Sequence, residues 1–179
     1  MHAYLKDIRM ENFQKVSPYA LPDNVFKLLD KEWMLVTAGD MNAFNTMTAS
    51  WGHFGIIWNL PVAIAYIRPQ RYTFEFANTH PFYTLSFFTE EFRKVLQFCG
   101  TKSGREHDKV KETGLLPVET ENGNIAFQQS RMLMECRKIY QDSLKKENFL
   151  LPGIAQKNYP IDDFHTFYMG EIVNVWIKS

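Results

Sequence analysis

The stretch Asn-Thr-Met-Thr-Ala-Ser-Trp at residues 45–51 sets the interpretation of the whole chain. Side chains of an extended strand alternate between two faces, so Thr46, Thr48 and Ser50 share one face, opposite the apolar residues between them. The preceding run, Trp-Met-Leu-Val-Thr-Ala-Gly at residues 33–39, is β-prone and ends at a Gly-Asp turn signal. The two runs predict a β-hairpin with one hydroxyl-bearing face, which is either an ordinary exposed strand face or a ligand-binding one.

Further strands follow along the chain. Short apolar runs bounded by turn residues predict strands at residues 61–67 and 83–88, and a longer run predicts the last strand at 167–177. Residues 132–137 alternate in a way that predicts a strand with one solvent-facing side. Residues 148–160 contain two prolines and a glycine, and we expect a lid or loop there that joins the last two strands.

Three segments show helical signals. Residues 72–78 predict a short helix with Thr73 at or near its start, where an anion can bind. Residues 89–98 repeat apolar side chains at helical spacing. Residues 107–113 precede Gly114, and glycine is a common helix stop.

Strands joined by hairpins, with a few short helices, fit a small and mostly antiparallel barrel better than a doubly wound sheet. No GxGxxG motif follows a strand, so a Rossmann dinucleotide site is not supported. The length of 179 residues predicts a single domain over residues 1–179.

The charge balance argues against polyanionic partners. Lys plus Arg total 20 and Asp plus Glu total 20, so the net charge is zero and neither nucleic acid nor an anionic membrane is an expected partner. Residues 1–7 carry charges where a signal peptide is apolar, and no apolar run approaches membrane-spanning length. We therefore expect a soluble, cytoplasmic protein. An aromatic content of 15% favours a dimer only weakly.

The cysteines and histidines show no metal-ligand spacing, so no metal site is expected. Cys99 and Cys136 have no identifiable catalytic partner and are expected to be free, packed thiols. His165 lies just before the last predicted strand, where an imidazole either moves a proton or makes a structural hydrogen bond. Trp51 and Trp58 are expected in the core or at an interface.

Three polar stretches, each at the end of a strand-like run, carry groups suited to a phosphorylated planar cofactor. Besides residues 45–51 they are residues 68–73 (RPQRYT) and 100–105 (GTKSGR). Arginine and lysine form charge-assisted bonds with phosphate, the hydroxyls of Thr73 and Ser103 add donors, and glycines let backbone N–H groups approach an anion. Singly, such charges are ordinary surface residues. Together, the three stretches predict a flavin mononucleotide (FMN) site.

The same stretches, with Asp108 and Lys109 after the third and Gly-Glu-Ile-Val at residues 170–173, resemble the flavin reductase-like, FMN-binding split-barrel family. The likeness is greatest to its flavoredoxin-type members and runs in order from about Trp33 onward. It implies a mostly β fold with short helices, a six-stranded antiparallel Greek-key split barrel. It also implies a homodimer that holds FMN near the subunit interface.

By this resemblance, Thr46, Thr48 and Ser50 bond ring or ribityl atoms of the flavin, and the other two stretches surround the ribityl chain and phosphate. His165 matches a histidine that many relatives place near the flavin, where reduced nicotinamide docks, and it is the expected catalytic residue. His53 departs from the family pattern, and it either stands by the flavin ring or is an exposed loop histidine. The expected cofactor-binding residues are Asn45, Thr46, Met47, Thr48, Ala49, Ser50, Trp51, Arg68, Arg71, Tyr72, Thr73, Cys99, Gly100, Lys102, Ser103, Gly104 and Arg105.

Two functions follow from this set. The first is an oxidoreductase with NAD(P)H as co-substrate, in which hydride passes to flavin N5 and electrons continue to free flavin, oxygen or a partner protein. The second is a flavoredoxin-like carrier of electrons or flavin that never meets a nicotinamide, since the sequence has no recognisable nicotinamide fingerprint. A haem- or pyridoxal-type ligand on a similar barrel is a third interpretation.

Overall fold

The computed structural model describes residue 10 and residues 12–179. Within that part of the chain, no helix is long and apolar enough to cross a membrane. Residues 1–7, on which the expected lack of a signal peptide rests, lie outside the described residues.

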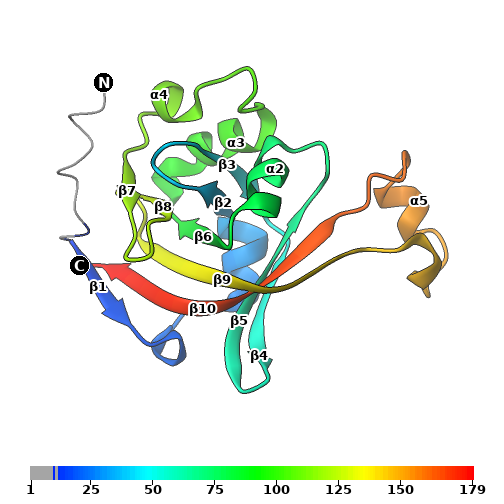
Figure 1. The fold of residues 1–179 in the computed structure, drawn as a ribbon, viewed down its shortest axis with the longest axis horizontal. Coiled ribbons are helices and arrows are strands. Elements are labelled where there is room, and N and C mark those ends of the chain that lie inside the picture. The colour runs from blue at the N-terminus through cyan, green and yellow to red at the C-terminus, as the bar shows by residue number, and fades with distance from the viewer. Residues whose placement is uncertain (1–9, 11) are drawn as a thin grey trace.

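An antiparallel sheet of eight strands forms the body of the molecule (Figure 1). Its order is β3-β2-β6-β9-β10-β5-β4, and β1 pairs with β10. The strands are β1 Phe13–Val16, β2 Met34–Gly39, β3 Phe44–Ala49, β4 Gly52–Ile57, β5 Leu60–Ile67, β6 Phe82–Phe87, β9 Met132–Ser143 and β10 Thr166–Lys178, and a separate hairpin pairs β7 Pro117–Glu119 with β8 Ile125–Phe127. The expected mostly β, antiparallel class is confirmed, whereas the expected count of six strands is wrong, because the short β1 and the edge strand β4 also join the sheet.

The helices are short and lie between the strands. They are α1 Val25–Lys27, continued by a π-helical turn at Leu28–Glu32, then α2 Tyr72–Thr79, α3 Arg93–Thr101, α4 Lys109–Thr113 and α5 Ile154–Asn158, with 3-10 turns at Pro18–Ala20, Glu90–Phe92 and Lys146–Asn148. The three helices expected from the sequence are confirmed. Gly114 ends α4 in the left-handed conformation that glycine permits.

Two apolar clusters fix where the site is built. One fills the inner side of the sheet, with Met47 and Ala49 of β3 among its members. The other packs Leu96 and Cys99 of α3 against Leu35 of β2. Strand β3 therefore has the barrel interior on one side and α3 on the other.

Strand β9 has no solvent-facing side over residues 132–136, which corrects the expectation for this segment. Leu133 packs with Trp176 and the β7-β8 hairpin. Glu135 is fully buried and accepts hydrogen bonds from the side chains of Thr120, Asn122, Asn124 and Asn174. The alternation in the sequence did not reveal that a second, small hairpin covers this face.

The segment between β9 and β10, residues 144–165, forms an arm that projects from the barrel (Figure 1). The expected loop joining the last two strands is thereby confirmed. It also contains α5, which at five residues is too short to show a periodic pattern. Trp58 lies at the tip of the β4-β5 hairpin and is 63% exposed, so of the two expected places, core or interface, the core is excluded.

Candidate functional site

Parts of all three predicted stretches meet at one place. We call this place the cradle, and it consists of Asn45 of β3, the start of α2 and residues 99–105. The side-chain amide of Asn45 donates a 2.7 Å hydrogen bond to the hydroxyl of Thr73 in α2. Gly104 lies so close to Asn45 that a Cβ there would overlap the amide oxygen. A larger residue at 104 would therefore force the Asn45 side chain or the loop to shift.

Two cations tie the cradle together through backbone carbonyls. Arg71 donates to the carbonyl oxygens of Gly100 at 2.7 Å and Cys99 at 3.3 Å. Lys109, only 5% exposed, donates to Thr46 at 2.7 Å and to the same Cys99 carbonyl at 3.0 Å. Burial lowers the pKa of Lys109 to about 8, and a proton-bearing ammonium at pH 7 thus links β3 to the end of α3.

Cys99 contributes to the cradle through its backbone carbonyl group. Burial raises the pKa of the Cys99 thiol to about 11, so the thiol is protonated at neutral pH. Cys99 and Cys136 are both free and buried. This confirms the expectation that they are packed thiols, and the contribution of Cys99 to the cradle is its carbonyl oxygen.

The hydroxyl face of β3 is present, but α3 covers part of it. Thr46 is 1% exposed and hydrogen-bonds the hydroxyl of Thr37 at 2.8 Å, while Thr48 donates to the carbonyl of Leu96 in α3. The role expected for the Thr46 hydroxyl, bonding a bound flavin, stays a prediction, and in this structure the hydroxyl has partners in β2 instead.

An inner cavity of about 220 Å³ lies next to the cradle. It is lined by Met47, Thr48, Ala49, Ser50, Trp51, Tyr66, Arg68 and His165. Strand pairing explains why residues so distant in sequence meet here. Thr166 of β10 pairs with Ile67 of β5, so the next residue beyond each strand end, His165 and Arg68, comes to the same rim.

His165 is 8% exposed and has a defined partner. Its Nδ1 lies 2.9 Å from the hydroxyl of Tyr159 on the arm, and its ring is 5.1 Å from that of Trp51. Burial, with a smaller contribution from the positive charge of Arg68, lowers the pKa of His165 to about 4. The imidazole is therefore neutral at pH 7, and it accepts or donates hydrogen bonds without carrying a charge.

The remaining predicted cations are not equally available to a ligand. Arg68 pairs with Asp163 at 2.5 Å and Arg105 pairs with Glu75 while its guanidinium lies 4.8 Å from the Tyr72 ring centre. Within the described residues, the ammonium of Lys102 has no hydrogen-bond or ion-pair partner, although it follows the last turn of α3 directly. Lys102 is thus the predicted cation most free to bind an anion.

Several residues of the site were missed by sequence reasoning. Lys109 was noted only as part of the family likeness, and nothing local marks it as buried. Tyr66 lines the cavity because it alternates with buried residues of β5. Tyr159 and Asp163 reach the site through the arm, from positions that no spacing rule connects to Arg68 or His165.

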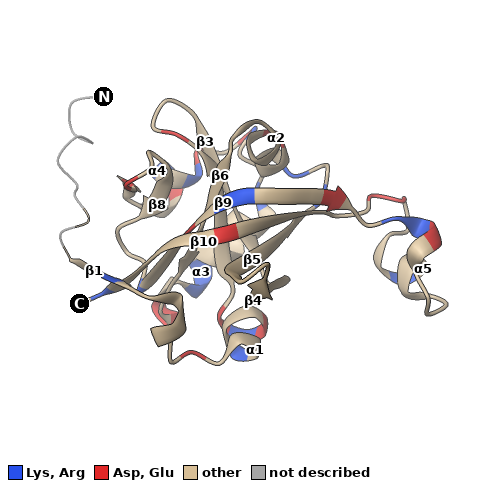
Figure 2. Ribbon diagram, turned by 60° about the horizontal axis from the view of Figure 1, so that its bottom comes forward, with Lys and Arg blue, Asp and Glu red and all other residues tan. Residues whose placement is uncertain are grey.

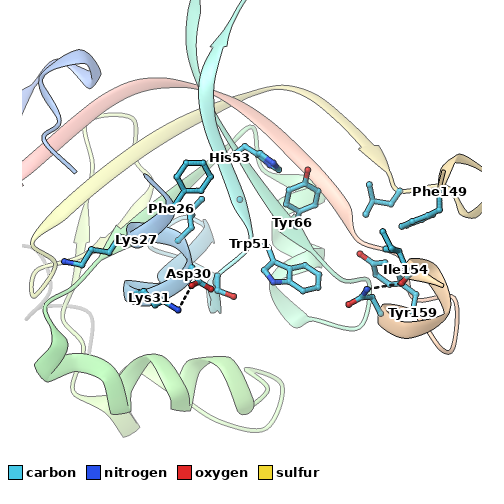
Figure 3. A pocket seen from close by; sticks show the side chains of 15 residues that line it. Phe26, Lys27, Asp30, Lys31, Trp51, His53, Tyr66, Phe149, Ile154 and Tyr159 are labelled. Carbon is cyan, nitrogen blue, oxygen red and sulfur yellow. Dashed lines mark hydrogen bonds and ion pairs between the residues drawn. The ribbon is translucent and has the colours of Figure 1, made fainter. Parts of the chain in front are cut away.

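Next to the inner cavity lies a larger depression of about 970 Å³, which we call the outer groove (Figure 3). Ser50, Trp51 and Tyr66 line both spaces. In Figure 3 the rings of Trp51 and Tyr66 lie at the centre, with α1 residues such as Phe26 on one side and arm residues such as Phe149 on the other.

Known proteins with similar folds share this architecture. The flavoredoxin of Methanosarcina acetivorans matches with a TM-score of 0.64 at 19% identity, over 83% of this chain and 69% of that one. The flavoredoxin of Desulfovibrio vulgaris matches with a TM-score of 0.65 at 20% identity, over 93% of this chain and 78% of that one. An NADH:FAD oxidoreductase of Streptomyces globisporus matches with a TM-score of 0.62 at 14% identity, over 80% of this chain and 73% of that one. At these identities the likeness establishes the fold.

Comparison at the level of sequence establishes the family as well as the fold. No curated protein sequence gives a significant match. The profile of the flavin reductase like domain, in contrast, matches residues 27–179, which is most of the chain and includes the cradle, the inner cavity and the arm. The fold is therefore the split barrel expected from the sequence, and the chain belongs to the flavin reductase-like domain family, a family of flavin-binding oxidoreductases.

Proposed function

We propose that the protein is an FMN-dependent oxidoreductase that takes its reducing equivalents from NAD(P)H. The single observation that carries this proposal is the convergence of the three predicted stretches. Asn45, Thr73, Arg71 and Gly104 come from distant parts of the chain, yet hydrogen bonds and close packing join them into one cradle beside a cavity. This arrangement supports an anion-binding end at the cradle and a flat, partly apolar end at the neighbouring cavity.

The groups present fit FMN. For the phosphate, the cradle offers the ammonium of Lys102 and the hydroxyl of Ser103, and within the described residues the backbone N–H groups of Tyr72 and Thr73 at the start of α2 have no acceptor. Such groups bind phosphate well. For the ring, the inner cavity offers the backbone of residues 47–51 and the rings of Trp51 and Tyr66.

A bound flavin would supply hydride and electron transfer at its N5 position. The side chains of this protein would position it and control its surroundings. Arg71 and Lys109 hold the cradle in one arrangement, so little reorganisation accompanies binding. His165, neutral and fixed by Tyr159, is proposed as the catalytic hydrogen-bonding group that orients the nicotinamide through its other ring nitrogen, which has no partner within the described residues.

The test is an absorption spectrum of the purified protein before and after anaerobic addition of NADH or NADPH, with any released cofactor identified by mass. We expect flavin bands that bleach faster than those of free FMN mixed with the same nucleotide. A protein that is colourless and takes up no added FMN would refute the proposal.

A flavoredoxin-like electron carrier is the second candidate, and the exposed apolar arm favours it. Leu150 is 94% exposed and Ile161 79%, which suits contact with another protein. Stable flavin bands that nicotinamides do not bleach, but that a reduced protein partner does, would select this function.

We further propose that the protein is a cytoplasmic homodimer. The exposed apolar residues Ile56 and Trp58 at the β4-β5 tip, together with Leu150, Leu151 and Ile161 on the arm, support an interface with a second copy. Light scattering coupled to size-exclusion chromatography should give twice the mass of the chain, and a monomer at micromolar concentration would contradict this.

A further inference from the structure

Tyr159 is the residue through which the arm contacts the imidazole at the inner cavity. It follows α5 directly, is only 5% exposed, and its hydroxyl lies 2.9 Å from Nδ1 of His165. The two ring planes are steeply inclined, at 78° to each other. Within the described residues, neither this hydroxyl nor this imidazole has another hydrogen-bond partner. The two buried groups therefore satisfy each other.

Arg68 holds Tyr159 in place from the barrel side. Its guanidinium lies 5.1 Å from the centre of the Tyr159 ring and donates to the carbonyl oxygen of Asn158 at 2.8 Å. The same guanidinium pairs with Asp163 at 2.5 Å, and Gln70 donates to that carboxylate at 2.7 Å. Arg68 thus binds the arm on both sides of the phenol in the chain, and charge-assisted bonds of this kind fix its position.

The arm also carries contacts of its own that return it to the barrel in one arrangement. At its base, the backbone N–H of Leu144 donates to the carbonyl oxygen of His165 at 2.9 Å. Farther out, Lys146 pairs with Asp162 at 3.0 Å, and Figure 2 shows basic and acidic positions close together around α5. An exposed pair adds little stability by itself. Together with the contacts of Arg68, however, it joins the two sides of the arm around the phenol.

The direction of the hydrogen bond between the two rings follows from the atoms that can donate. A phenol has one hydrogen to donate, and a neutral imidazole has one nitrogen that donates and one that accepts. Burial raises the pKa of the Tyr159 hydroxyl, so the group keeps its hydrogen at neutral pH. If Nδ1 of His165 donated, that buried hydrogen would have no acceptor among the residues that the structure describes. The arrangement that uses the hydrogen is the one in which Tyr159 donates.

The other ring nitrogen, Nε2, is the one left for the inner cavity. His165 lines that cavity with its ring 5.1 Å from the ring of Trp51, while Nδ1 is turned to the arm. Because the imidazole is uncharged at neutral pH, a hydrogen that is absent from Nδ1 is present on Nε2. An N–H group in such a partly buried place pairs best with a carbonyl oxygen.

We infer that Tyr159 is a positioning residue for His165: its hydroxyl donates to Nδ1, fixes the tautomer with the hydrogen on Nε2, and so makes the imidazole a donor to a carbonyl oxygen of the molecule bound in the inner cavity. That this oxygen belongs to the carboxamide of a nicotinamide rests on the proposed function. The tautomer, in contrast, is a property of the protein alone and can be measured without any nucleotide.

The first experiment determines the tautomer. Long-range ¹H–¹⁵N correlation spectra of the purified protein, labelled with ¹⁵N-histidine, show which ring nitrogen carries the hydrogen. The signals of His165 are assigned as those lost in His165→Gln. At pH 7 we expect a hydrogen on Nε2 and none on Nδ1. A hydrogen on Nδ1, or two tautomers in similar amounts, would overturn the inference.

A pH titration of Tyr159→Phe by the same spectra tests the direction of the hydrogen bond. This change removes only the hydroxyl and leaves Arg68 and Asp163, the charged groups beside the imidazole, as they are. A hydroxyl that donates to Nδ1 favours the neutral imidazole, so its loss should raise the pKa of His165 from about 4 toward the ordinary value. A hydroxyl that accepts from Nδ1 favours the protonated form, and its loss would lower that pKa.

The matched control is Tyr140→Phe, which removes a hydroxyl from a tyrosine of β9 that is 48% exposed and has no hydrogen-bond partner within the described residues. It should leave the titration of His165 unchanged. A pKa of His165 that falls or stays the same in Tyr159→Phe, or that rises equally in both variants, would overturn the positioning role.

Kinetics of the flavin-loaded protein test the carbonyl partner. Tyr159→Phe should raise the KM for NADH or NADPH roughly threefold to tenfold, because an imidazole that is no longer held in place has to be ordered on binding. The FMN content should stay the same. An unchanged KM would overturn the assignment of the acceptor. If neither nucleotide reduces the wild-type protein, the proposed function fails instead, and the tautomer seen in the spectra still stands.

Discussion

The cradle and the outer groove flank the same inner cavity, yet different forces build them. In the cradle, Asn45, Arg71 and Lys109 make hydrogen bonds to defined oxygen atoms, and Gly104 fits without space to spare. The groove is an apolar surface whose arm wall is held to the barrel mainly by the Arg68–Asp163 pair and the contact between His165 and Tyr159. Single substitutions should therefore cause large losses of stability or affinity in the cradle and small losses in the groove.

The largest effect should come from Lys109→Met, which removes the buried ammonium but keeps most of the side-chain volume. The carbonyl groups of Thr46 and Cys99 would lose their donor. We expect a loss of about 3 kcal/mol in the free energy of unfolding, measured in urea, because two buried acceptors are left unsatisfied. Lys111→Met, an exposed position on the same helix, is the control and should change stability little.

Gly104→Ala should have the next largest effect. The new Cβ would overlap the amide of Asn45, so either the loop moves away from β3 or the Asn45 side chain gives up its hydrogen bond to Thr73. We expect a loss of about 2 kcal/mol in flavin binding, or roughly thirtyfold in Kd, by fluorescence titration. Gly55→Ala is the matched control because nothing lies within 4 Å of its added Cβ. Equal affinities of the two variants would mean that the cradle tolerates displacement.

Comparing Lys102→Ala with Arg71→Ala distinguishes a residue that binds the ligand from one that stabilises the fold of the site. Lys102 has no partner within the described residues, so its loss should lower flavin affinity roughly tenfold at unchanged stability. Arg71 holds the carbonyl groups of Cys99 and Gly100, so its loss should lower both affinity and the urea midpoint. Stability that falls equally in both variants would contradict this division of roles.

At neutral pH the smallest effect is that of His165, at the boundary between the two regions, and it becomes visible only as the pH is lowered. The pKa of His165 is about 4 in the folded chain, against an ordinary value of about 6.5. Between these values the unfolded chain binds more protons, so the free energy of unfolding should fall as the pH is lowered from about 6.5 to about 4. His165→Gln should flatten this part of the profile, whereas His107→Gln, which retains His165, should leave it in place. An identical slope in His165→Gln would exclude burial of this imidazole.

Local patterns in the sequence were sufficient for the cradle in outline. Thr73 near a helix start, the glycines at 100 and 104 and the cations beside them are all signals within a few residues of one another, and the structure brings them together. The same patterns could not show that α3 packs on the hydroxyl face of β3. Nor could they show that Arg71 is occupied by carbonyl groups of its own chain, whereas Lys102 has no partner in the part of the chain that the structure describes.

Sequence alone determined the class of fold and the position of the main strands along the chain, and it predicted the three stretches that meet in the cradle, because strand alternation, turn residues and helix caps are short-range features. Tertiary structure alone decided which polar atoms remain free. The register of β5 with β10 sets Arg68 beside His165, and the return of the arm brings Tyr159 to that imidazole. Those contacts span up to about a hundred residues, and no local pattern records the pairing of groups so far apart in the chain.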